Sequence, residues 1–158
     1  MGRPKEHKVT RLNYCQYLLS SQINYTLTNF AEHLENVSHD TINRYLRDDK
    51  LTPCLLWEHT QEQIIFSKQG YIIFDDSILD KNYSNNIGAV RWQYSGNAHR
   101  IMRGIGLVNG IYINPTNPYW TIDYRVFSPD SEGKSKMDPV QNMLTHVLEH
   151  KKIPFKTV

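Results

Sequence analysis

The chain has 158 residues, of which 39% are hydrophobic and 22% charged, and its formal net charge is +2. These values are typical of a globular protein with enough apolar side chains for a core, and so small a charge does not by itself indicate a nucleic-acid partner. No apolar stretch approaches the roughly 20 residues that span a bilayer, and the start of the chain lacks the apolar core of a signal peptide. Cys15 and Cys54 lie among apolar residues, as free cysteines do in the reducing cytoplasm, where we expect the protein to be located.

The first third of the chain predicts helices. Apolar residues at helical spacing indicate the buried faces of the first two: Leu12, Cys15, Leu18 and Leu19, then Leu27, Phe30, Ala31 and Leu34. Ser38 is a good N-cap for a third helix, and Thr52-Pro53 starts a fourth. We therefore expect a small helical bundle over residues 1–69.

The second and third of these helices have the dimensions of a helix-turn-helix, whose second helix enters the major groove of DNA. The polar face of that helix would present His39, Asn43, Arg44 and Arg47. Arginine and asparagine suit bidentate contacts with guanine and adenine. The alternative is a solvated face on an ordinary bundle.

Around Gly70 the pattern changes to that of strands, and we expect a second region over residues 70–158. Three strands are predicted, at 71–76, 100–113 and 119–127, of which the last two should pair as a hairpin. A helix follows, with Asp138 as its cap, Pro139 in its first position and an apolar stripe from Val140 to Leu148. Residues 154–158 look like the opening of a fourth strand.

This order of elements predicts an α+β protein whose second region is the first part of a ribonuclease H-like domain. From about Asn13 onward the sequence resembles the DDE transposases of bacterial insertion sequences, in which a helical DNA-binding region precedes such a domain. The residues that carry the resemblance are Phe74-Asp75-Asp76-Ser77, the tract from Arg91 to Asn97, Arg103-Gly104-Ile105-Gly106, and the tract from Trp120 to Arg125.

The resemblance implies a metal-dependent endonuclease with a catalytic Asp at the end of the first strand, followed by one variable residue and a hydroxyl residue. That pattern selects Asp75, with Ser77 as the hydroxyl, and leaves Asp76 as its neighbour on the opposite face if the pleat continues. Asp80, expected in the following loop, and Asp123 are weaker carboxylate candidates. The bland alternative for Asp75 and Asp76 is a turn that ends the strand.

The family's second catalytic Asp and its Glu have no counterpart before Val158, so the resemblance implies a transposase truncated before its second metal ligand. Cutting a phosphodiester in this way uses a pair of Mg²⁺ (or Mn²⁺) ions, which one carboxylate does not fix. Three hypotheses follow: a truncated transposase that binds transposon ends in double-stranded DNA, a non-enzymatic DNA-binding protein that inhibits full-length transposase by occupying its sites or joining its homo-oligomer, and a decayed product that folds poorly.

Two further basic segments are candidates for contact with DNA. A tract before and into the second strand interleaves aromatic and basic residues: Arg91, Trp92, Tyr94, His99, Arg100 and Arg103. It suits backbone phosphates or an unpaired base, and its alternative is a loop packed by Trp92 and Tyr94. Arg3, Lys5, Lys8 and Arg11 form a basic N-terminal arm.

His146 and His150 lie one helical turn apart, which invites a zinc interpretation. The glutamate of the H-E-x-x-H motif is absent and no third ligand is indicated, so we favour ordinary histidines near a helix end.

Overall fold

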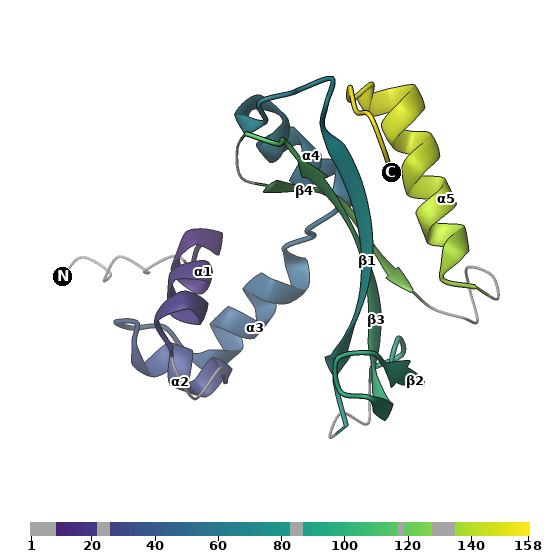
Figure 1. Ribbon diagram of the computed structural model, residues 1–158. Coiled ribbons are helices and arrows are strands. Elements are labelled where there is room, and N and C mark those ends of the chain that lie inside the picture. Colours follow the sequence, from purple (N-terminus) through teal and green to yellow (C-terminus); the bar gives the residue numbers. More distant parts are fainter. Residues whose placement is uncertain (1–8, 22–25, 83–86, 117–118, 128–134) are drawn as a thin grey trace. The chain divides into compact units, whose positions relative to one another are not determined.

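The computed structural model describes residues 9–21, 26–82, 87–116, 119–127 and 135–158, and these form a mixed α+β protein (Figure 1). They divide into two compact units: a helical unit, Met1–Leu51, and a sheet unit, Thr52–Val158. Within the described ranges, no helix has both the length and the apolar character needed to cross a membrane.

The helical unit contains α1 (Arg11–Ser20), α2 (Leu27–Glu32) and α3 (His39–Asp48). Each begins behind a hydroxyl residue whose side chain accepts a backbone N–H from the first turn: Thr10, Thr26 and Ser38. The expected cap at Ser38 is therefore confirmed. Val9, Tyr17, Phe30 and Ile42 are buried together and join the helices into one core.

The buried face of α1 is not the one that the leucine spacing predicts. Leu12 is 65% and Leu19 88% exposed, and Cys15 is exposed as well. The ring of Tyr17 instead stacks on Phe30, with centroids 4.6 Å apart. A large aromatic ring buries more apolar area than a leucine, so the aromatic residues decide which way α1 faces.

The sheet unit is built on four antiparallel strands, with the long β3 in the middle. Their bounds are β1 (Tyr71–Asp80), β2 (Arg91–Ser95), β3 (Arg100–Ile113) and β4 (Tyr119–Phe127). β1 pairs along one edge of β3, while β2 and β4 pair with successive parts of its other edge. The predicted hairpin of the last two strands is confirmed.

Two of the expected strand assignments need correction. β1 does not end at the acidic pair but continues to Asp80, because Ser77-Ile78-Leu79 keep pairing with β3. Asp80 is therefore the last residue of the strand and not part of a loop. The tract that starts at Arg91 is a strand as well, since it pairs with residues 100–104 at the start of β3.

One face of the sheet is buried and the other is open within the sheet unit. Along β3, every second residue from Met102 to Tyr112 is buried, while the residues that alternate with these are only partly covered. This alternation is the pleat of a strand with one face on a core. Helices α4 (Pro53–Thr60) and α5 (Met137–His146) cover the buried face, where α4 contacts β4 and α5 contacts both β3 and β4.

Helix α5 lies where the sequence predicts it, but its start differs. It begins at Met137, and Lys136 in the N-cap position makes no side-chain capping bond. Asp138 is thus inside the first turn and is not the cap. A π-helical turn, η2 (Val147–Lys151), continues the helix, and the segment beyond it forms a parallel bridge from Thr157 to Tyr71 of β1.

The border between the units lies between Leu51 and Thr52, whereas the change in sequence pattern pointed to Gly70. The difference is helix α4. Thr52 caps it and Pro53 takes its first turn, as predicted. Its Trp57 packs against the buried cluster of the sheet unit, which includes Ile72 and Tyr112, so α4 belongs with the sheet.

Candidate nucleic-acid interface and acidic sites

Helix α3 presents the predicted DNA-contacting residues to solvent. His39, Asn43, Arg44 and Arg47 are all exposed, while Ile42 on the opposite side is fully buried. His39, Asn43 and Arg47 follow each other at intervals of four, and such residues share one face of a helix. The structure thus brings the four side chains together on a single exposed face.

Acidic neighbours reduce the positive charge of this face. Nε2 of His39 lies 3.2 Å from Oδ1 of Asp40, and Nε of Arg47 lies 3.1 Å from Oδ1 of Asp48. Both partners of the second pair are about 70% exposed, at 71% and 70%. Exposed pairs of this kind contribute little and exchange readily, so Arg47 can leave Asp48 for a phosphate or a base.

The end of α3 is tied to α1 by a two-pronged ion pair. Arg11 donates from Nη2 to Oδ1 of Asp49 at 2.6 Å and from Nε to Oδ2 at 3.1 Å. These hydrogen bonds hold the pKa of the Asp49 carboxyl below its usual value. Arg11, expected in the basic arm, is therefore engaged in the fold, and Arg3, Lys5 and Lys8 lie outside the described residues.

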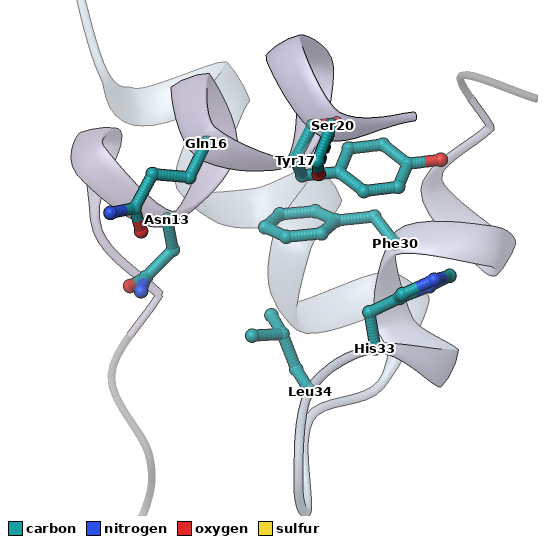
Figure 2. Close-up of a pocket in the computed structure, with 7 residues that line it drawn as sticks. All are labelled: Asn13, Gln16, Tyr17, Ser20, Phe30, His33 and Leu34. Carbon is teal, nitrogen blue, oxygen red and sulfur yellow. Dashed lines mark hydrogen bonds between the residues drawn. The ribbon is translucent and has the colours of Figure 1, made fainter. Parts of the chain in front are cut away.

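A pocket of about 190 Å³ lies between α1 and α2 (Figure 2). The stacked rings of Tyr17 and Phe30 form its wall, and the Tyr17 hydroxyl donates to Oδ1 of Asn29 at 2.8 Å. None of the lining residues belongs to α3. The pocket therefore does not include the exposed face of α3.

Asp75 and Asp76, the predicted catalytic residues, lie side by side in the middle of β1 and point to opposite faces. Asp75 pairs with Asn109 on the open face, and Asp76 pairs with Val108 on the face that α5 covers. The expectation that the pleat separates the two residues holds because the strand runs on to Asp80. One metal ion cannot take both carboxylates as ligands in this arrangement.

The surroundings of Asp76 favour a cation, but the structure supplies one from the protein. Lys136 donates to Oδ2 of Asp76, and both residues line a small cavity of about 150 Å³ together with Phe74 and Val140. Mg²⁺ takes several oxygen ligands. Asp75 also borders this cavity, but it takes the opposite face of β1, so the cavity is offered one carboxylate beside an ammonium group. These residues do not make the donor set of a Mg²⁺ site.

The most completely buried carboxylate belongs to Asp123, which the sequence placed among the weaker candidates. Its burial comes from an irregularity in the pairing of β4 with β3: Gly110 pairs with Asp123, but the next residue, Ile111, pairs with Thr121. The extra residue is Ile122. Such a bulge re-aims side chains, and here both Ile122 and Asp123 are 0% exposed.

Three groups donate hydrogen bonds to the Asp123 carboxylate. Oδ1 accepts from the backbone N–H of Tyr124 at 2.8 Å and from Nη1 of Arg125, and Oδ2 accepts from Nζ of Lys151 at 2.8 Å. The side chain of Lys151 is only 2% exposed. Its Nζ also donates to the carbonyl oxygen of Ile122 at 2.6 Å and lies 5.1 Å from the centre of the Trp57 ring. Burial lowers the pKa of Lys151, against the opposing effect of Asp123.

His146 borders this ionic cluster. Its Nδ1 lies 3.6 Å from Oδ2 of Asp123, is buried, and makes no hydrogen bond within the described part of the chain. Burial, followed by the positive charge of Lys151, lowers the pKa of His146. The rings of His146 and His150 are 4.8 Å apart, yet no group of His, Cys, Asp or Glu among the described residues is arranged to hold a metal ion.

The other predicted DNA contacts lie on the hairpin of β2 and β3. Arg91 begins β2 and donates to the carbonyl oxygens of Gly88 and Val90, at 2.7 and 2.8 Å. Arg100 begins β3 and is exposed, whereas Arg103 pairs with Trp92 across the two strands. The hairpin belongs to the sheet unit and α3 to the helical unit, so the predicted contacts are divided between the two units.

Sequence reasoning missed the ionic cluster around Asp123 because Lys151 and His146 are far from Asp123 in the chain and because the burial of Asp123 depends on a bulge. The sequence signal was a pair of oppositely charged residues, Asp123 and Arg125, on one strand. Comparison with models of protein families, with curated proteins and with solved structures gave no match to this chain.

Proposed function

We propose that this protein binds double-stranded DNA through α3 and takes part in DNA transposition, as a relative of the insertion-sequence transposases. The observation that carries the proposal is the exposed face of α3, where His39, Asn43, Arg44 and Arg47 gather behind a short helix. A capped helix with arginine and asparagine on its free side suits readout of base edges in the major groove.

Support for the transposase part comes from the sheet unit. β1, three further antiparallel strands and helix α5 are followed by a segment that returns parallel to β1. The amide of Ile72 donates to the carbonyl oxygen of Thr157 at 3.0 Å, and that of Lys156 donates to Gly70 at 2.8 Å. The parallel return to β1 supports the ribonuclease H-like part of the proposal, whereas β2 is a strand beyond the three that the resemblance implies before the helix.

A second candidate is a DNA-binding protein without catalysis, which inhibits full-length transposase by occupying its sites or joining its oligomer. The opposite directions of Asp75 and Asp76, and the ion pair of Asp76 with Lys136, favour this role for the present chain. An assay of DNA cleavage with Mg²⁺ or Mn²⁺ separates the candidates. Cleavage that Asp75→Ala or Asp76→Ala abolishes supports the enzyme, and binding without cleavage supports the inhibitor.

The test of DNA binding starts by selecting a preferred sequence from a randomised duplex library. Arg44→Ala should then weaken binding to the selected sequence by about 1 to 3 kcal/mol and binding to a scrambled duplex much less. Lys68→Ala removes the same charge from an exposed site outside α3 and is the matched control. Equal losses on both duplexes would make Arg44 a phosphate contact, and failure of the wild-type chain to bind any duplex at low salt would refute the proposal.

A further inference from the structure

The hairpin of β2 and β3 carries exposed aromatic residues on the open face of the sheet. Trp92 pairs with Arg103 and Tyr94 pairs with Ile101. Directly opposed residues of antiparallel strands project to the same side, so all four share one face. It is continuous with the side of β3 that the helices of the sheet unit leave uncovered.

These side chains are exposed to an unusual degree. Trp92 is 70%, Tyr94 60% and Ile101 66% exposed, whereas the other two tryptophans, Trp57 and Trp120, pack against the buried cluster of the sheet unit. A contiguous patch of exposed apolar side chains often marks a binding site, whereas a single exposed apolar residue is common on any protein surface. Trp92 and Tyr94 are two residues apart on one strand, so their rings project about 7 Å from each other.

The charged residues of the hairpin itself are all basic, and the nearest acidic residue in the strand pairing is Asp80 of β1, opposite Gly104. Residues 81–122 contain no Asp or Glu, and within them Lys81, Arg91, Arg100 and Arg103 carry positive charge. Arg103 stands directly across from Trp92 in the strand pairing. Aromatic rings next to arginines, without any acidic residue in the same stretch, complement a flexible polyanion whose bases are free to stack.

We propose that this face of the β2–β3 hairpin binds single-stranded nucleic acid, with unpaired bases stacked on Trp92 and Tyr94 and with Arg103 beside the phosphates. A duplex does not fit this surface, because its bases are already stacked on one another and show only their edges in the grooves. The inference goes beyond the duplex binding assigned to α3 and does not depend on it, since the two surfaces share no residue.

The test uses the full chain and a fluorescein-labelled oligo-dT, with oligo-U as a second probe that separates DNA from RNA. Trp92→Leu should weaken binding roughly fivefold to 150-fold, the range that loss of one stacked base gives, and Trp92→Phe should retain most of it. Tyr119→Leu is the matched control, because Tyr119 is a 69% exposed aromatic residue on β4, away from the hairpin.

A second readout is the intrinsic tryptophan fluorescence. Oligo-dT should quench it in the wild type, and the quenching should largely vanish in Trp92→Phe, because Trp57 and Trp120 are packed in the sheet unit. Equal losses in Trp92→Leu and Tyr119→Leu would overturn the proposal. So would a change from dimer to monomer in Trp92→Leu without any loss of oligo-dT binding, since the face would then be a contact between two copies of the chain.

Two variants test the hairpin and α3 separately. Trp92→Leu should lose oligo-dT and keep the selected duplex, whereas Arg44→Ala should do the reverse. A wild-type chain that binds oligo-dT but no duplex would refute the role of α3 and leave the hairpin proposal intact. Wild-type chain that binds the duplex but neither oligo-dT nor oligo-U would refute the hairpin proposal.

Discussion

The helical unit and the sheet unit each hold an aspartate against an arginine, but in opposite surroundings. Asp49 meets Arg11 near the surface, where the side chains are 16% and 38% exposed. Asp123 is fully buried, and Arg125 and the almost fully buried Lys151 surround it. The Arg11–Asp49 pair lies outside the buried core of the helical unit, whereas Asp123 and its partners lie inside the sheet unit.

The two units should therefore differ in how much stability they lose when an ion pair is removed. A surface ion pair can be lost to water at small cost, because both charges are solvated when they separate. A buried pair that loses one member leaves the other charge without water or a partner. We therefore expect charge changes and acid to damage the sheet unit before the helical unit.

The largest effect should come from Asp123→Ala. It leaves the ammonium of Lys151 buried without its carboxylate, which should cost about 3 to 5 kcal/mol of the free energy of unfolding of the sheet unit. Urea denaturation followed by tryptophan fluorescence measures it, because all three tryptophans, Trp57, Trp92 and Trp120, lie in that unit.

The double variant Asp123→Ala/Lys151→Met sharpens this test. Methionine removes the stranded charge, so the double variant should lose less stability than the sum of the two single variants. A loss below about 1 kcal/mol in Asp123→Ala would mean that the cluster adds little to the core.

A smaller effect, again confined to the sheet unit, should follow from Gly104→Ala in β3. An added Cβ would lie 2.5 Å from Cγ2 of Ile78 and 2.5 Å from the backbone oxygen of Leu79, and the backbone cannot give way without moving β1. We expect a loss of about 1 to 3 kcal/mol in the same urea experiment. Gly96→Ala is the control, because a Cβ there meets nothing within 4 Å and should leave the transition unchanged.

The smallest effect should appear in the dependence of stability on pH. Because the pKa of His146 is lowered from the usual 6.5, the unfolded state binds more protons, and the sheet unit should lose stability as the pH falls below about 6.5. His146→Gln should flatten this slope in a fluorescence-detected titration. A wild-type stability that does not change between about pH 7 and about pH 5 would contradict this role of His146.

The helical unit should respond in a different window. The pKa of Asp49 is lowered from 3.8, so its contribution is present above that value and is lost as the pH falls through the lower pKa of the folded state. Asp49→Asn should remove this acid-sensitive step and leave the change near pH 6.5 in place. Circular dichroism records it, since the helical unit has no tryptophan.

Local patterns in the sequence predicted elements well where the signal was also local. Ser38 and Thr52 cap the helices that were expected behind them, and β3 and β4 have the predicted bounds. A cap needs only the next three residues, and an alternating strand records its buried face along its own length. The exposed face of α3 followed for the same reason.

Local patterns failed where a distant partner made the decision. β2 is short and polar, and it becomes a strand because β3 offers an edge to it. β1 continues past Asp75 and Asp76 for the same reason, since pairing with β3 outweighs the low strand preference of aspartate. The face of α1 depends on Phe30, which belongs to another helix.

Several features depend on neighbours within a few residues and can be predicted without the structure: the α+β class, the capped N-terminal helices, the hairpin of long strands, and the basic and polar face of α3. The tertiary structure decided the directions of Asp75 and Asp76 and the ion pair with Lys136. It also buried Asp123 through a one-residue bulge. The side-chain period in a strand is two, so a single extra residue reverses the face that a carboxylate takes. Only the register with a distant strand fixes that choice.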